Sequence, residues 1–249
     1  MEQTPLILTG PPGCGKSHWI QKYAESVNKQ LFVCPCRKDR TLRDGRQKLH
    51  VWARRTEPAI LWLEGADDLT PEAQAFLRRI LETHAKEVQF ILECRDAGRL
   101  QEPIRSRCVI QRIYLPSWSD LETYAQRAFP FLEEKEHDGR LEEIHYYLTE
   151  NEYSYRRIQQ CAHLIQYATD EWDRIVKHRR EEQQEWSNMS SDRLIQYVRS
   201  AYHPERMIRH LLADKKTWSA YGECIETGGS LWAFLGSALD KGYITPVKQ

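Results

Sequence analysis

Apolar residues in the first half of the chain fall into short runs separated by polar or Gly/Pro-containing segments. Five such runs cover residues 6–8, 31–34, 59–63, 88–92 and 110–114. Short apolar runs of this kind are typical of parallel strands buried on both faces. The intervening segments have helical spacing, so strands and helices alternate. The pattern predicts an α/β domain over residues 1–115, with a parallel sheet covered by helices on both faces.

The spacing of apolar residues changes after residue 120. Positions three or four apart recur over residues 121–128, 141–148 and 158–165, which predicts three helices. We therefore expect a three-helix lid over residues 116–168. Residues 169–192 are highly charged and predict a linker or an exposed helix end. Residues 193–249 return to helical spacing and predict a further all-helical domain.

The most specific motif follows the first apolar run. Residues 10–17 read Gly-Pro-Pro-Gly-Cys-Gly-Lys-Ser, and a helix-forming segment comes next. Backbone N–H groups of such a loop surround a phosphate chain at the positive end of the helix, the lysine reaches the β- and γ-phosphates, and the serine hydroxyl ligates Mg²⁺. The alternative is a Gly/Pro-rich turn without a ligand. The predicted nucleotide contacts are Gly10, Pro11, Pro12, Gly13, Cys14, Gly15, Lys16 and Ser17, with Ser17 also a metal ligand.

Charge distribution is more informative than net charge. Lys+Arg and Asp+Glu are equal at 36 each, so net charge does not indicate a nucleic-acid partner. Residues 36–55, however, contain eight basic residues against two acidic ones. Residues 120–152 contain ten acidic residues against three basic ones. We expect one basic face and one acidic module.

Cysteine usage and hydropathy indicate the compartment. The seven cysteines form no regular framework, and Cys34 and Cys36 are the only close pair, so neither disulfides nor a zinc site is predicted. No apolar run approaches membrane-spanning length, and no signal segment is evident. We expect a soluble protein of the reducing cell interior, without a membrane partner.

Three further stretches narrow the function. Residues 61–79 contain Leu-Glu-Gly-Ala-Asp and then Ala-Gln-x-x-Leu-Arg-Arg, residues 90–108 end in Ser-Arg-Cys, and residues 153–157 read Tyr-Ser-Tyr-Arg-Arg. Together with the phosphate loop, they resemble the small subunits of the sliding-clamp loader, the replication factor C family of AAA+ ATPases. The resemblance covers roughly residues 5–168. Its most specific element is Ser-Arg-Cys at residues 106–108.

The resemblance implies a subunit of an ATP-dependent ring or spiral. Such an assembly opens a sliding clamp and places it on primer–template DNA at sites of replication. The implied partners are other AAA+ clamp-loader subunits, the clamp and the DNA, and the implied cofactors are ATP and Mg²⁺. Arg107 takes the place of the arginine finger, which stabilises charge on the phosphoryl group in a neighbour's site. Arg156 matches the arginine that contacts the γ-phosphate at the start of the last lid helix.

The resemblance also implies a surface that follows DNA phosphates. Contacts of this kind give sequence-independent, salt-dependent affinity. An exposed basic helix without a DNA contact is the alternative. Residues 193–249 correspond in position to the family's collar but match no motif of it. The residues implied in DNA contact are Arg40, Arg43, Arg46, Lys48, Arg78 and Arg79.

Three positions depart from the family pattern. Where the family has Asp-Glu-Ala-Asp, residues 64–67 read Glu-Gly-Ala-Asp. Glu64 can still hold the Mg²⁺ shell, but Gly65 cannot replace the glutamate that orients and deprotonates the attacking water. Loss of such a group typically lowers the rate by about 10²–10⁴-fold. Where the family usually has a polar sensor after the fourth strand, often asparagine, this chain has Arg95. We therefore expect weak hydrolysis or none.

Three other functions share some of these features. In a fully active clamp-loader ATPase, Glu64 or a group from elsewhere would supply the missing base. In a non-enzymatic scaffold, the phosphate loop would be a relic. A small-molecule phosphotransferase is disfavoured, because the motifs at residues 73–79 and 106–108 have no role in such a kinase.

Overall fold

The computed structural model of the chain describes residues 4–83, 86–134, 138–149, 153–189, 193 and 196–197. The chain divides into two compact units. The first, the α/β unit, comprises residues 1–121 and 154–157, and the second, the helical unit, comprises residues 122–153 and 158–249. Nearly all of the collar-like domain predicted over residues 193–249 lies outside the described residues.

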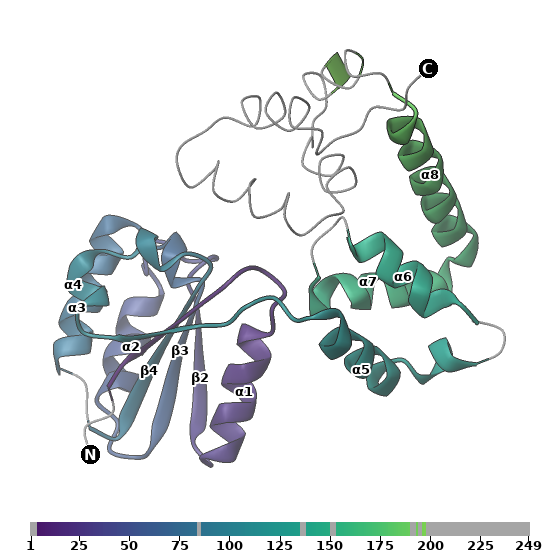
Figure 1. The fold of residues 1–249 in the computed structure, drawn as a ribbon. Coiled ribbons are helices and arrows are strands. Elements are labelled where there is room, and N and C mark those ends of the chain that lie inside the picture. Colours follow the sequence, from purple (N-terminus) through teal and green to yellow (C-terminus); the bar gives the residue numbers. More distant parts are fainter. Residues whose placement is uncertain are drawn as a thin grey trace. The chain divides into compact units, whose positions relative to one another are not determined.

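A five-stranded parallel sheet forms the centre of the α/β unit (Figure 1). Its strand order is β2-β3-β4-β1-β5. The three inner strands are largely buried because helices cover both of their faces, whereas β2 and β5 are edge strands with more exposed residues. The strands are β1 (Leu6–Thr9), β2 (Gln30–Pro35), β3 (Ala59–Glu64), β4 (Val88–Cys94) and β5 (Val109–Arg112).

Helices cover the sheet on both faces. Helix α1 (Lys16–Ser26) lies on one face, and helices α2 (Gly45–Ala53), α3 (Pro71–Thr83) and α4 (Glu102–Arg105) lie on the other (Figure 1). Single 3₁₀ turns follow two of the strands, at η1 (Ala66–Asp68) and η2 (Ala97–Arg99). The predicted α/β fold class is confirmed.

Alternation along each strand divides the core into two layers. Successive side chains of a strand point to opposite faces of the sheet. Ile60 and Trp62 of β3 therefore pack with Ile20 of α1. Leu61 and Leu63 belong to the larger cluster with α2, α3 and α4. A run that is apolar at every position satisfies both layers, which is why the inner strands lack polar alternation.

The parallel arrangement determines where a site can form. All five strands run in the same direction, so the loops that follow them meet at one edge of the sheet. Ligands of open α/β sheets bind at this carboxyl edge. The phosphate loop after β1 and the segments after β3 and β4 are therefore neighbours.

The described part of the helical unit contains helices and one 3₁₀ turn, η3 (Pro130–Glu133). The three predicted lid helices correspond to α5 (Trp118–Ala128), α6 (Arg140–Thr149) and α7 (Tyr155–Tyr167). The first residues of α5 and of α7 belong to the α/β unit. Among the described residues, no helix has the length and apolar character needed to cross a membrane.

Residues 169–187 form helix α8 (Thr169–Ser187), within the stretch predicted as a linker or an exposed helix end. Despite its charge, α8 buries Trp172 completely. The indole N–H of Trp172 donates a hydrogen bond to Glu143 of α6 at 3.1 Å, and Asp173 forms an ion pair with Arg140 of α6. These contacts hold α8 against α6.

Candidate nucleotide-binding site

The phosphate loop joins β1 to α1 at the carboxyl edge of the sheet. It ends in the first turn of α1, where the N–H groups of a helix lack intrahelical partners and attract anions. Close packing explains the glycine at its start, since a Cβ on Gly10 would lie 2.1 Å from the carbonyl oxygen of Ile113. The loop can therefore follow this path only with glycine at that position.

Lys16 points back into the loop. Its side chain is buried, and its ammonium group donates hydrogen bonds to the carbonyl oxygens of Gly10 at 2.7 Å and Pro11 at 2.8 Å. A buried ammonium group is unfavourable without such acceptors. Phosphate oxygens of a ligand could replace these carbonyls, so Lys16 lies where a phosphate chain would need it.

Glu93, at the end of β4, is a residue that the sequence patterns did not single out. Its carboxylate is buried and accepts hydrogen bonds from the Ser17 hydroxyl at 3.3 Å and the Trp62 indole N–H at 2.9 Å. Burial raises the pKa of Glu93, while Lys16 and the two hydrogen bonds partly oppose this effect. The available signal was an acidic residue ending an apolar strand at the edge where ligands bind.

Glu64 lies beside Glu93. The two residues are paired in register on β3 and β4, and the charge of Glu64 contributes to the raised pKa of Glu93. Ser17 and two carboxylates therefore lie at one edge of the sheet. Hydroxyl and carboxylate oxygens are ligands that Mg²⁺ accepts, so the residues fit this ion.

These side chains do not form a complete metal cage. In the part of the chain that the structure describes, no group of three or more His, Cys, Asp or Glu side chains could hold a metal ion. Mg²⁺ is commonly held by one or two carboxylates together with substrate phosphates. The edge therefore fits a metal ion that arrives with a nucleotide.

Gly65 follows Glu64 in a left-handed backbone conformation, with φ 73° and ψ 43°. This conformation favours glycine over other residues. A Cβ on Gly65 would lie 2.5 Å from both Cγ and Nε of Arg37. The position where the family carries its glutamate thus has no carboxylate, and an arginine side chain fills the adjoining space.

Arginine side chains gather around Asp68 on η1. Arg95 donates to both carboxylate oxygens at 2.8 and 3.1 Å, Arg37 Nε lies 3.4 Å away and Arg99 lies 3.5 Å away. Asp67 is buried and accepts the backbone N–H of Arg95 at 3.1 Å. Arg95, at the predicted sensor position, is thus engaged in an ion-pair network.

Arg156 lies beside the phosphate loop, in the first turn of α7. The backbone N–H of Tyr155 donates to the carbonyl oxygen of Gly13 at 3.0 Å. A Cβ on Gly13 would lie 3.2 Å from Cβ of Arg156. The side chain of Arg156 is exposed. This placement is compatible with the predicted phosphate contact, which stays a prediction.

Arg107 lies between α4 and β5, away from the phosphate loop in sequence. Its guanidinium forms an ion pair with Glu82 of α3 at 2.8 Å and donates to the carbonyl oxygen of Pro103 at 2.7 Å. The side chain is 41% exposed. Both partners belong to the chain itself, so the predicted role in a neighbouring site stays a prediction.

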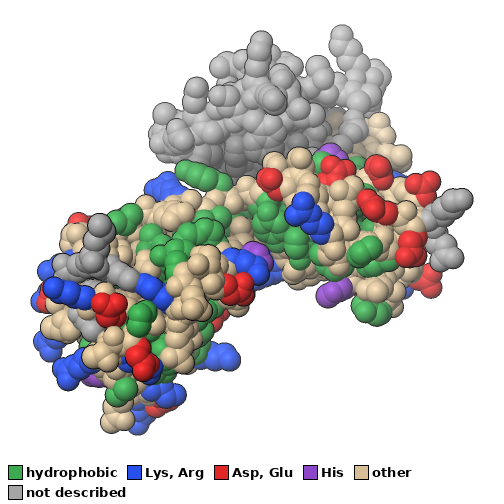
Figure 2. Space-filling model, turned by 90° about the horizontal axis from the view of Figure 1, so that it is seen from below, with side chains coloured by type: hydrophobic (Ala, Val, Ile, Leu, Met, Phe, Trp, Pro, Cys, Tyr) green, Lys and Arg blue, Asp and Glu red, His purple; other side chains and the backbone are tan. Residues whose placement is uncertain are grey.

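The six residues predicted to follow DNA are all exposed. Several also make contacts within the chain. Arg46 lies over the ring of Phe76 at 5.2 Å, Arg40 Nε donates to the carbonyl oxygen of Asp68 at 2.8 Å, and Arg78 pairs with a glutamate one turn along α3. Figure 2 shows lysine and arginine side chains over the visible face of the α/β unit. Contact with DNA stays a prediction.

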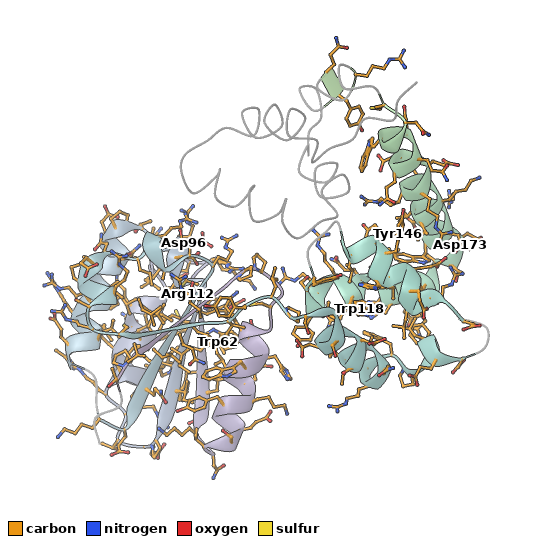
Figure 3. All side chains as sticks on the ribbon, viewed as in Figure 1. Trp62, Asp96, Arg112, Trp118, Tyr146 and Asp173 are labelled. Carbon is orange, nitrogen blue, oxygen red and sulfur yellow. The ribbon has the colours of Figure 1, made fainter. Side chains whose placement is uncertain are left out.

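A hollow of about 600 Å³ adjoins the start of the phosphate loop. It lies at the ends of β1, β4 and β5, and Asp96 and Arg112 both line it (Figure 3). Arg95 and Arg105 also contribute to the lining. Two of these arginines pair with carboxylates outside the lining, Arg95 with Asp68 and Arg105 with Glu102.

Comparison with known proteins identifies the relatives of the α/β unit. Residues 6–116 match the AAA family, the ATPase family associated with various cellular activities. A replication factor C small subunit from Archaeoglobus fulgidus is 35% identical over 118 residues, which are 43% of this chain and 37% of that protein. Replication factor C subunit 4 from Encephalitozoon cuniculi is 36% identical over 114 residues, which again cover 43% of this chain and 37% of that protein. The chain thus matches little more than a third of the length of these relatives.

A solved structure extends the likeness in fold. The RuvB Holliday junction branch migration motor of Thermotoga maritima is similar with a TM-score of 0.56 and 15% identity. The similarity covers 80% of this chain and 70% of that one. At this low identity the comparison concerns fold alone.

Proposed function

We propose that this chain is a subunit of a sliding-clamp loader, because residues 6–116 match the AAA family and the chain is similar to replication factor C subunits. It binds ATP with Mg²⁺, supplies Arg107 to a neighbouring subunit, and hydrolyses little ATP itself. Its partners are other AAA+ subunits, a sliding clamp and primer–template DNA.

The arrangement around Lys16 and Ser17 is the observation that carries this proposal. Lys16 is held inside the phosphate loop by two carbonyl oxygens, and the Ser17 hydroxyl faces Glu93, which is in register with Glu64. The phosphates of ATP would take the place of these carbonyl oxygens around Lys16. Ser17 and the Glu64 carboxylate would hold Mg²⁺ together with the phosphates, where the ion would neutralise phosphate charge.

The proposed division of labour follows from two positions. Gly65 has no side chain to orient the attacking water, so hydrolysis in this subunit is slow. Arg107 retains the Ser-Arg-Cys setting and acts in the site of the next subunit, where an arginine finger is worth about 10³–10⁵ in rate. The subunit therefore contributes more to a neighbour's reaction than to its own.

A fully active ATPase is the second candidate, because Glu93 is a buried carboxylate close to Ser17. A carboxylate with a raised pKa is better matched to proton transfer near neutral pH than an ordinary one. Steady ATP turnover by the isolated chain that disappears in both Lys16→Ala and Glu93→Gln would favour this candidate.

Affinity purification from the native cell extract with Mg²⁺ and ATP tests the proposal. Other AAA+ subunits and a sliding clamp should co-purify with the wild-type chain, as identified by mass spectrometry. Lys16→Ala should recover less of the clamp, because clamp opening depends on ATP. Recovery of neither a clamp nor a related ATPase would exclude clamp loading.

A further inference from the structure

The side chain of Arg37 occupies the space beside Gly65. A Cβ on Gly65 would lie 2.5 Å from Cγ and Nε of Arg37 and 3.0 Å from its Cδ. Three atoms along the stem make this approach, so Arg37 lies across the glycine instead of touching it with its tip. Gly65 is buried. Arg37 therefore fills the volume into which a side chain at position 65 would extend.

Hydrogen bonds and strand register place Arg37 beside the end of β3, one strand away from Glu93. The backbone N–H of the residue before it donates to the carbonyl oxygen of Glu64 at 2.9 Å. Glu64 is in register with Glu93, whose carboxylate accepts the Ser17 hydroxyl. In a phosphate-loop site, the metal and the terminal phosphate lie between the loop serine and an acidic residue that ends another strand of the sheet. The proposed function gives this place to Glu64 of β3, which β4 separates from β1. Gly65 comes immediately after that acidic residue.

The charge of Arg37 is only partly compensated. Its Nε lies 3.4 Å from Asp68, a carboxylate that also pairs with Arg95 at 2.8 Å and Arg99 at 3.5 Å. Even with Asp67 included, three guanidinium groups meet two carboxylates, which leaves excess positive charge. The Arg37 side chain is 40% exposed, so it remains accessible to a ligand. Because Arg37 shares its carboxylate partner with two other arginines, its guanidinium group can bind an additional anion.

We propose that Arg37 binds the terminal phosphate of the nucleotide and takes the place of the missing carboxylate, so that this subunit holds ATP instead of hydrolysing it. The inference rests on the proposed function, because it requires ATP in the phosphate loop. A guanidinium binds two phosphate oxygens through parallel N–H bonds and stays protonated. It therefore stabilises the terminal phosphate but cannot accept a proton from water.

Equilibrium affinities for ATP and ADP test this role of Arg37. Arg37→Gln keeps much of the stem over Gly65 and removes the charge. We expect it to weaken ATP binding by about tenfold to a hundredfold, the range for hydrogen bonds to charged groups, and to leave ADP binding nearly unchanged. The measurement is calorimetric titration of the full chain with Mg²⁺. Arg54→Ala, an exposed arginine at the end of α2, is the control and should alter neither affinity.

The outcomes separate this inference from the proposed function. If Arg37→Gln binds ATP as tightly as the wild type, or loses ATP and ADP affinity equally, Arg37 does not contact the terminal phosphate, although ATP binding stands. If the folded wild-type chain binds neither nucleotide, the proposed function fails and this inference with it. Should Arg37→Gln not fold, Arg37→Lys applies the same test, because lysine cannot form two parallel bonds and should weaken ATP binding alone.

Discussion

At the scale of single residues, the candidate site depends on charged groups held away from water. Lys16 and Glu93 are both buried, and each is satisfied by hydrogen bonds at the carboxyl edge of the sheet. Burial of a charge is unfavourable unless partners compensate it. Substitution of Lys16 should therefore change ATP affinity, and substitution of Glu93 should change the pH dependence of stability, whereas substitutions of exposed charges should change neither.

Lys16→Ala should weaken ATP binding by at least about tenfold, because a charge-assisted contact to phosphate is lost. Titration with a fluorescent ATP analogue measures the effect. Lys22→Ala on the same helix is the matched control, since Lys22 is exposed and pairs only with Glu25 in the contacts described. Equal affinity in wild type and Lys16→Ala would mean that the loop does not hold a phosphate chain.

The pH dependence of stability should reveal Glu93. Its pKa is raised in the folded state by burial, so the folded chain binds more protons than the unfolded chain between the ordinary and the raised value. The contribution of Glu93 to stability should accordingly fall as pH rises through that window and should be greatest below the ordinary glutamate pKa. Glu93→Gln removes this dependence. Urea unfolding at a series of pH values compares it with Glu87→Gln, an exposed glutamate whose curve should follow the wild type.

At the scale of elements, the segment after β3 combines a left-handed turn with close packing. Gly65 has φ 73° and lies against Arg37. Gly139 has φ 79°, and among the described residues other than its chain neighbours nothing lies within 4 Å of the place that a Cβ would take. The two glycines share a backbone conformation and differ in available space. Replacing each glycine by alanine therefore separates the free-energy cost of the left-handed backbone from the cost of steric overlap with Arg37.

Gly65→Ala should destabilise the chain more than Gly139→Ala. The left-handed conformation costs about 1–2 kcal/mol for a residue with a Cβ, and this applies to both variants. Overpacking against Arg37 adds roughly 1–3 kcal/mol at position 65 alone. Denaturant unfolding measures both variants, and the difference should shrink in an Arg37→Ala background. If it persists there, the contact with Arg37 is not its cause.

The strands and the phosphate loop were predictable because local patterns specify them. Every apolar run became a strand, and the turn chemistry of residues 10–17 needs only the neighbouring strand and helix. Residues 169–187 were harder to interpret. Their charge suggested exposure, but Trp172 lies buried against α6, a contact that depends on a residue 29 positions away.

At the scale of the whole molecule, the proposed function depends on contacts with neighbouring subunits. Arg107 pairs with Glu82 within the chain, and it must leave this partner to reach another subunit. An exposed ion pair contributes only about 0–1 kcal/mol, so the exchange is energetically accessible.

Arg107→Ala should leave this chain's own ATP affinity unchanged but lower the ATPase rate of the reconstituted assembly. The loss at the neighbouring site is expected to be about 10³–10⁵-fold, the range for arginine fingers. Single-turnover hydrolysis by the purified assembly measures it, with Arg54→Ala as the control. An unchanged rate in an assembly of normal composition would show that Arg107 is not a finger.

The sequence by itself determined how strands and helices follow one another along the chain, the phosphate loop and the absence of a carboxylate at position 65. Each of these depends on residues close together in the chain. Only the tertiary structure decided which distant side chains meet. Ser17 and Glu93 are 76 residues apart and become neighbours because β4 pairs with β1. Arg37 reaches Gly65 because β2 pairs with β3. The spatial order of the strands is a property of the whole sheet, so these contacts follow from packing and not from any local pattern.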